Sequence, residues 1–293
     1  MRITESIRLN TALAGEATSS SRLNDLTRMA SSGVKVDAPS QDPAAYARIV
    51  RADGQITLLG ARQMTLDRSA GDLATADSTL SSASDLMIQA HSIALQMSNG
   101  AMSATDRAGA ATQIAGIRSQ LLTIANTKGA NGYIFGGTKT DTPPFDATTG
   151  AFTGNDNVIN VEVADGVTAA ANASGAKAFT VAGGNDVFAD LDNFAAALTS
   201  NNAAGIQSAI GQLDADHSQI VGAQVNVGVM TNRLTSASDV IGNSLTQVKS
   251  ARAVDHDIDS PTVLSQLTAT QTAYEQALAV TKQILSLSSF TQG

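Results

Sequence analysis

The sequence contains no cysteine and no tryptophan, and aromatic residues make up only 3% of its 293 positions. Without cysteine, the chain cannot form a disulfide, a thiolate metal site or a cysteine nucleophile. Enzyme pockets usually have aromatic walls, so the scarcity of aromatic side chains argues against catalysis. Neither G-x-S-x-G nor G-x-G-x-x-G occurs, and no glycine is followed directly by Lys-Ser/Thr, as a phosphate loop requires. We therefore expect a protein that is not an enzyme and holds no cofactor.

Charged residues are also scarce, at 15% of the chain. The 18 Lys and Arg against 26 Asp and Glu give a formal net charge of −8. An acidic chain without a basic patch cannot displace counterions from a nucleic acid, so we expect no nucleic-acid partner. No apolar run approaches the roughly 18 residues of a membrane span, so we expect no membrane partner. Residues 1–30 are amphipathic and lack the apolar core of a signal peptide, which predicts export without a cleaved leader.

What the chain has instead is apolar stripes of helical spacing at both ends. The C-terminal stretch places its stripe at alternating steps of three and four residues, which is the spacing of a coiled coil. A second C-terminal stripe lies beside the first, and the N-terminal stretch carries a weaker one. The first C-terminal stripe is Leu264, Leu267, Gln271, Tyr274, Leu278, Thr281, Leu285 and Ser288, the second is Ala277, Val280, Ile284 and Leu287, and the N-terminal stripe is Ile3, Ile7, Leu13, Ala17, Leu23, Leu26 and Met29.

Periodicity alone leaves two possibilities for these terminal helices. They can pair with each other and be complete, or they can pack on other subunits. Two stripes on one short helix exceed what a single partner covers, which favours burial between subunits. The residues predicted to form the assembly interface are Ile3, Ile7, Leu13, Leu23, Leu26, Met29, Leu264, Leu267, Tyr274, Leu278, Val280, Ile284, Leu285 and Leu287.

Two long helices are predicted between the terminal segments. Asp42-Pro43 supplies an N-cap followed by proline at the first helical position, and the helix continues to Asn99-Gly100. The second long helix ends in the loop 255–259, before Ser260-Pro261 begins the last helix. A shorter helix, expected from Ser103 to Lys128-Gly129, folds back on the first. The apolar positions in register are Ile56, Leu59, Leu66, Ala70, Leu73, Leu80, Met87 and Ala94 in the first long helix, and Ile206, Ile210, Leu213, Ile220, Val227, Leu234, Ile241, Leu245 and Val248 in the second.

The middle of the chain differs in composition. Residues 131–184 are rich in Gly, Thr, Asn and Asp, and their short alternating runs predict strands at 133–135, 158–163 and 179–181. A helix capped by Asn185 or Asp186 follows. Most of the phenylalanines lie between positions 135 and 194, so we expect a small β domain with a core of its own.

The predicted fold is therefore mainly α, with long antiparallel helical rods formed by the N- and C-terminal parts of the chain. A small β-rich domain is inserted in the middle. We expect three domains: terminal coiled-coil assembly helices over 1–41 plus 256–293, a helical rod over 42–130 plus 200–255, and a β-rich insert with one helix over 131–199.

The three histidines do not predict a metal site. His91 and His217 occupy seam positions of the long helices, where a polar residue sets the register. The segment Asp255–Asp259 holds three acids around His256, but acidic residues ahead of a helix are favoured by its dipole. Its spacing also matches no calcium loop. We expect no metal.

Three stretches of the chain form a recognisable set: Met1-Arg2-Ile3-Thr4, Ser32-Gly33 with Pro39-Ser40-Gln41-Asp42-Pro43, and the run from Asn131-Gly132-Tyr133-Ile134-Phe135-Gly136-Gly137 to Pro143-Pro144-Phe145. They resemble bacterial flagellin relatives and, more closely, the hook-associated protein 3 family of the distal hook–filament junction. The resemblance runs along the whole chain, and the third stretch is the more specific for the junction family over flagellin. At position 41 the chain has Gln where the family often has an acid, which leaves Asp42-Pro43 intact.

The resemblance implies a structural adaptor subunit of the extracellular bacterial flagellum, secreted through the flagellar type III export apparatus. In such proteins the terminal helices are disordered in the monomer and fold on assembly into a coiled-coil tube. The implied partners are further copies in a ring, hook-associated protein 1 on the hook side, flagellin on the filament side and an export chaperone at the C-terminal helix. Two alternatives stay open: a flagellin that forms the filament itself, and a secreted helical adhesin whose β insert binds a ligand.

Overall fold

The computed structural model describes residues 2–180 and 185–290, and the side chains of residues 6–180 and 185–286. The chain forms two compact units. Unit 1 comprises Met1–Leu58 and Leu245–Gly293, and unit 2 comprises Leu59–Ser244. Residues 43–58 and 245–255, which we expected in the rods, thus cluster with the terminal helices. Unit 2 holds the remainder of the long helices together with the β-rich insert.

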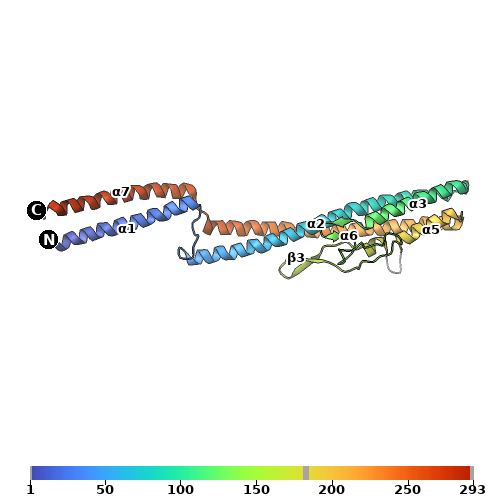
Figure 1. Ribbon diagram of the computed structural model, residues 1–293, viewed down its shortest axis with the longest axis horizontal. Helices are drawn as coiled ribbons and strands as arrows, with labels where there is room; N and C mark the ends of the chain where they lie inside the picture. Colours follow the sequence, from blue (N-terminus) through green and yellow to red (C-terminus); the bar gives the residue numbers. More distant parts are fainter. Residues whose placement is uncertain (1, 181–184, 291–293) are drawn as a thin grey trace. The chain divides into compact units, whose positions relative to one another are not determined.

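The fold is mainly α, as predicted, with two small antiparallel hairpins (Figure 1). The long helices α2 and α6 contain 55 and 54 residues. The elements in order are α1 (Arg2–Ser32), α2 (Pro43–Met97), α3 (Ala104–Ala125), β1 (Lys128–Gly129), β2 (Gly132–Tyr133), β3 (Asn160–Ala164), β4 (Val167–Ala170), α4 (Gly175–Phe179), α5 (Val187–Thr199), α6 (Ala203–His256) and α7 (Ser260–Phe290).

Local signals set the helix ends. Asp42 accepts hydrogen bonds from the backbone N–H groups two and three residues on, at 3.0 and 2.9 Å, and so caps α2. Ser103 and Asp106 form the capping box of α3, and Asp186 caps α5. Gly33 ends α1 with φ of 73°, a left-handed conformation that costs glycine little. The predicted helix starts at Asp42, Ser103 and Asp186 are confirmed.

The core of unit 2 follows the predicted heptads. Helices α2, α3, α5 and α6 contribute to one hydrophobic cluster, and α3 packs closely on α5 beside the long helices (Figure 1). A second row of small residues, which the sequence reading missed, is equally buried and allows close helix approach. The confirmed large residues are Leu66, Leu73, Leu80, Met87, Leu213, Ile220, Val227, Leu234 and Ile241, and the missed row is Ser69, Ala76, Ala83, Ala90 and Ala209.

The insert differs from the prediction in three ways. Helix α3 ends at Ala125, three residues early, because Lys128 and Gly129 pair as β1 with β2. Phe179 lies in the short helix α4, capped by Ser174, and not in a strand. Val181, the end of that predicted strand, lies outside the described residues. Strand β4, which we did not predict, pairs with β3.

The prediction of a separate β-domain core was wrong. The insert's phenylalanines belong to the same cluster as the long-helix residues. Phe145 and Phe179 are fully buried, and their rings meet edge to face at 5.5 Å. Asp72 of α2 accepts hydrogen bonds from the Ala130 backbone N–H at 2.7 Å and the Asn131 amide at 2.6 Å. The insert therefore uses the helices as one wall of its core and is tied to α2 by polar contacts.

Candidate assembly surface of the terminal helices

Helices α1 and α7 of unit 1 lie side by side and run antiparallel (Figure 1). We call the line of residues along which they pack the seam. Most of their buried or half-buried positions fall at alternating steps of three and four residues, as in a coiled coil. The seam is Leu9, Ala12, Glu16, Ser19, Leu23, Leu26 and Ala30 on α1, and Val263, Leu267, Thr270, Tyr274, Ala277, Thr281 and Ile284 on α7.

The seam with α1 coincides with neither of the two predicted stripes of α7. The actual seam runs between the two predicted stripes, taking Leu267, Tyr274 and Thr281 from the first. From the second stripe it takes Ala277 and Ile284. Both stripes are apolar, so hydrophobic spacing alone could not choose between them. On α1 the reading missed Leu9 and instead took Ile7, which is exposed.

The seam itself is weak for a helix pair. It contains Glu16, Ser19 and Thr270 at half-buried positions, and only Leu26, Val263 and Thr281 of the seam are buried. Thr281 buries its hydroxyl oxygen with no hydrogen-bond partner among the described residues. An unsatisfied buried hydroxyl is unfavourable, by about 1–3 kcal/mol. Pairing of α1 with α7 alone therefore uses little of their apolar surface.

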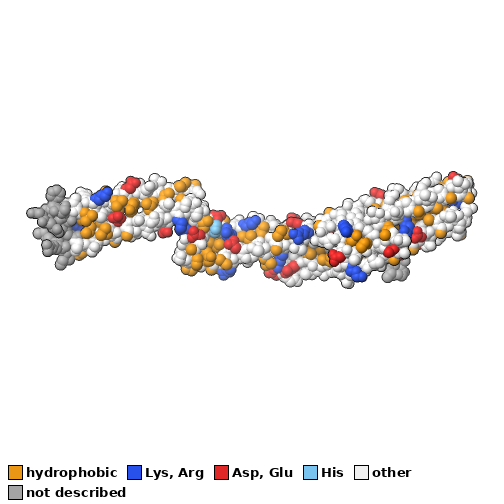
Figure 2. All heavy atoms as spheres, in the orientation of Figure 1, with side chains coloured by type: hydrophobic (Ala, Val, Ile, Leu, Met, Phe, Trp, Pro, Cys, Tyr) orange, Lys and Arg blue, Asp and Glu red, His pale blue; other side chains and the backbone are white. Residues whose placement is uncertain are grey.

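The predicted interface residues divide into three groups. Leu26 is buried in the seam, and Leu23, Met29, Leu267, Tyr274, Leu278 and Ile284 are half-buried. Five are exposed: Ile7 (56%), Leu264 (55%), Val280 (51%), Leu285 (48%) and Leu13 (46%). Ile3 and Leu287 lie outside the residues whose side chains are described. Figure 2 shows hydrophobic side chains along the visible surface of both terminal helices.

The loops at the base of these helices, residues 33–42 and 257–259, hold each other through the backbone. We call them the base loops. Val34 pairs with Asp257 as an antiparallel bridge, and the Lys35 N–H donates to the His256 carbonyl at 2.7 Å. The Ile258 N–H donates to the Gly33 carbonyl at 3.3 Å. The ends of α1 and α6 are thereby fixed to the start of α7.

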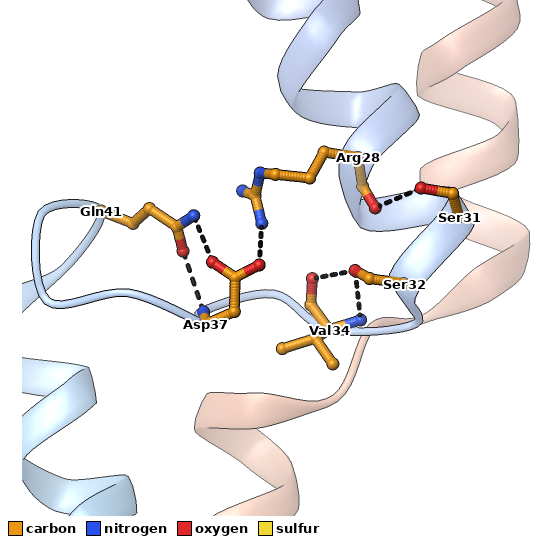
Figure 3. Close-up of polar contacts among 6 residues, drawn as sticks. All are labelled: Arg28, Ser31, Ser32, Val34, Asp37 and Gln41. Atoms are coloured by element: carbon orange, nitrogen blue, oxygen red, sulfur yellow. Dashed lines mark hydrogen bonds and ion pairs between the residues drawn. The ribbon is translucent and has the colours of Figure 1, made fainter.

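Side chains brace the first base loop (Figure 3). Arg28 of α1 lies 3.1 Å from the Asp37 carboxylate. The Gln41 side chain accepts from the Asp37 N–H at 2.9 Å and donates to the Asp37 carboxylate at 2.5 Å. The Gln that departs from the family's usual acid thus uses its amide as both donor and acceptor, which a carboxylate could not do.

Two arginines join α2 to α6 beside the base loops. Arg48 forms a bidentate pair with Asp255, at 2.8 and 2.7 Å, and Arg252 lies 2.5 Å from Asp53. The hydrogen bonds from Arg48 hold the pKa of Asp255 below its ordinary value. Asp255, considered above as a metal ligand, therefore has an arginine as its partner. The sequence reading missed both pairs, because residues about 200 positions apart give no local signal.

The remaining candidate features are the histidines, possible metal ligands and possible membrane-spanning helices. No cluster of three or more His, Asp or Glu able to hold a metal is found among the described residues. His217 lies 2.9 Å from Ser84 across the long-helix seam. Within the described part of the chain, no helix has the length and apolar character to cross a membrane.

One buried acid stands out in unit 2. Asp216 of α6 is fully buried, and neither carboxylate oxygen has a hydrogen-bond partner among the described residues. Burial, together with the nearby carboxylates Asp190 and Asp186 of α5, raises the pKa of Asp216 to about 7.

Comparison with known proteins finds flagellar proteins to which this chain is similar. Residues 4–140 match the bacterial flagellin N-terminal helical region. A putative flagellar hook-associated protein from Vibrio parahaemolyticus is 23% identical, with a TM-score of 0.68 over 74% of this chain and 99% of that one. FlgL from Xanthomonas campestris is 17% identical, with a TM-score of 0.60 over 70% and 99% of the two chains. The flagellar junction protein FlgL from Legionella pneumophila is 17% identical, with a TM-score of 0.56 over 71% and 99%.

A search of curated proteins gave no match. The structural likenesses show the fold. The sequence match covers α1, α2, α3 and the first hairpin. The resemblance to flagellin-like, hook-associated proteins is therefore confirmed.

Proposed function

We propose, starting from this flagellin-like fold, that the chain is a structural adaptor subunit of the bacterial flagellum. It joins hook to filament through packing of its terminal helices and carries out no catalysis. The flagellin N-terminal match and the hook-associated structural neighbours support the flagellar assignment. The junction position rests on the likeness to proteins named for that junction.

The exposed apolar surface of the α1/α7 pair is the observation that carries the proposal. Leu264 and Val280 are more than half exposed, although each lies next to the seam. Among the described residues, five large apolar side chains of this helix pair are exposed, and exposed apolar side chains that adjoin one another mark an interaction surface. Because the seam between α1 and α7 buries so few residues, further helices are needed to cover the remainder. We propose that other subunits supply them.

The proposed partners follow from that surface. Copies of the chain form a ring, hook-associated protein 1 contacts the hook side and flagellin contacts the filament side. An export chaperone covers the C-terminal helix before assembly. Residues 1–41 and 256–293 acquire their final order only on assembly, since a weak seam offsets little of the conformational entropy lost on folding. The extracellular location follows from the same proposal.

The filament itself is the second candidate, because the matched N-terminal region is that of flagellin. Deleting the gene in its own bacterium distinguishes the two. The junction proposal predicts hooks without filaments, with flagellin released into the medium. Filaments that remain attached to hooks would refute it, and loss of the filament protein itself would favour the second candidate.

A substitution tests the surface. The Leu264→Asp variant should leave the thermal unfolding of the monomer unchanged, because the side chain is 55% exposed, and should abolish incorporation into flagella. Ile88→Asp is the matched control: Ile88 is 54% exposed but lies on α2 in unit 2. Complementation of the deletion strain and electron microscopy of its flagella provide the measurement. Normal filaments with Leu264→Asp, or equal loss with Ile88→Asp, would contradict the proposal.

A further inference from the structure

A pocket lies in unit 2 between the insert and the middle of α6, and we call it the insert pocket. Its volume is about 380 Å³, within the range of about 300–1,000 Å³ that is usual for small-molecule sites. Helix α6 forms one wall, and residues from segments 156–158 and 170–177 of the insert form the other (Figure 1). The pocket contains no residue of the terminal helices, so it is separate from the proposed assembly surface.

The floor of the insert pocket is apolar. Leu80 of α2, Val227 of α6 and Ala173 of the insert line it, and all three are buried. Met230 lies one turn beyond Val227 on α6 and is half-buried. Val158 is exposed, so it lies toward the opening. An aliphatic group that entered the pocket would leave water and contact these side chains.

The exposed residues that line the pocket carry a net positive charge. They include Lys177 of the insert and Arg233 of α6, against Asp156 as the one acid among the described lining residues. Lys177 already lies 3.5 Å from Asp156. Arg233 has neither a hydrogen bond nor an ion pair with any described residue. One guanidinium is therefore available in a chain of net charge −8, and its planar donors match a carboxylate.

One face of α6 presents this guanidinium together with a second polar group. Asn226, Met230 and Arg233 follow one another at steps of four and three residues, so they lie on the same side of the helix. The Asn226 side chain also has no hydrogen-bond partner among the described residues. The wall thus combines an apolar surface with a small number of unpaired polar groups, which is typical of a ligand site.

The wall formed by the insert is held in place by polar contacts. The Asn172 side chain accepts from the Ile159 N–H at 2.8 Å and donates to the Asn157 carbonyl at 3.1 Å. Arg62 of α2 lies 2.8 Å from Glu162, which ties the β3–β4 hairpin to the long helix. A wall that is already ordered loses little conformational entropy when a ligand binds.

We propose that the insert pocket binds a small organic anion with a single carboxylate on an aliphatic body. The carboxylate binds at Arg233, and the aliphatic body packs on Leu80, Val227 and Met230. One uncompensated cation suits a single negative charge better than the near-double charge of a phosphate group. The inference goes beyond the proposed function, because it gives the insert a binding activity that assembly of the terminal helices does not require.

Octanoate is the probe, because it carries one carboxylate on an unbranched aliphatic chain. We expect isothermal titration calorimetry of the full-length chain, below the concentration at which octanoate forms micelles, to show one saturable site. The melting temperature of unit 2 should rise with octanoate concentration, since a ligand of the folded state stabilises it. Octylammonium has the same chain with the opposite charge, and acetate lacks the chain. Both should bind more weakly than octanoate by about tenfold or more.

Two substitutions should change the affinity in opposite directions. Arg233→Gln should weaken octanoate binding by about tenfold or more. Asp156→Asn removes the competing negative charge and should strengthen binding, which a misfolded variant could not do. Arg68→Gln is the matched control, because Arg68 is also exposed in unit 2 but lies outside the pocket, and it should bind as the native chain does.

Three results would overturn the inference: no saturable binding of octanoate to the folded native chain, equal affinity for octylammonium, or native affinity in Arg233→Gln. Weaker binding in Asp156→Asn would also contradict it. None of these measurements depends on flagellar assembly, so a negative result leaves the proposed function unaffected.

Discussion

Asp216 should make the stability of unit 2 depend on pH. The group is fully buried, and its carboxylate faces Asp186 and Asp190 with no hydrogen-bond partner among the described residues. Its pKa is raised from the ordinary 3.8 to about 7 in the folded chain. The folded state therefore holds a proton that the unfolded state releases above its own pKa. The resulting stability is fully present below pH 3.8 and is lost as the pH rises through about 7.

The magnitude follows from the two pKa values. The full difference corresponds to roughly 4 kcal/mol, at about 1.36 kcal/mol for each tenfold change in proton affinity. Between pH 5 and pH 8, the accessible part is about 2.5 kcal/mol of unfolding free energy. An Asp216→Asn variant cannot ionise, so it should lack this slope. Its stability relative to the native chain should rise as the pH rises.

Urea unfolding followed by circular dichroism at several pH values between 5 and 8 measures this difference. Asp85→Asn is the control, because Asp85 is exposed on α2 in the same unit. It should retain the slope of the native chain. Parallel slopes for the native chain and Asp216→Asn would refute the reasoning, since the carboxyl group would then ionise without cost in both states.

Three further substitutions test the packing and the base loops. Ala83→Leu fills a fully buried position of the small-residue row and should destabilise unit 2 by about 1–3 kcal/mol in urea unfolding, and an unchanged midpoint would contradict close helix approach there. Gly137→Ala places a methyl group against the Asn155 backbone carbonyl at a residue with φ of 68°, and should lower the free energy of unfolding by about 1–2 kcal/mol or more. A melting temperature equal to that of the native chain would contradict this prediction. Asp255→Asn removes the carboxylate that Arg48 binds, so hydrogen exchange at the Lys35 amide in assembled flagella should be faster than for the native chain at neutral pH. Because the pKa of Asp255 is depressed, this difference should vanish as the pH falls through that pKa, and a difference that persists in acid would count against the pair.

The sequence predicted the parts of the fold that large apolar residues and caps determine. Leu73 and Leu80 of α2 lie seven residues apart, as do Leu213 and Ile220 of α6, and all four are buried as expected. The small-residue row was missed because alanine is common on exposed and buried faces alike, so Ala76 and Ala83 give no contrast in a hydrophobic pattern.

The sequence did not determine which face of α7 packs on α1. Two adjacent apolar stripes on α7 left it undetermined which residues pack on α1. The residues that do so lie between the two stripes and include Ala277 and Ile284. Phe179 was assigned to a strand because a short apolar run fits strand and helix equally well. The ion pairs of Arg48 and Arg252 depend on helices brought together only by the tertiary fold, which local patterns do not encode.

The bridge between the base loops joins segments that are far apart in the sequence, which affects the order in which the two units fold. Val34 pairs with Asp257, and α1 finds its seam partner only in α7, the last helix of the chain. Any process that delivers the polypeptide from its N-terminal end first must therefore hold α1 without its partner until almost every other residue has arrived. Loops that long form contacts slowly, so unit 1 should complete its structure after unit 2. The two ends of the polypeptide would then be the last regions to mature, although one of them is the first to emerge.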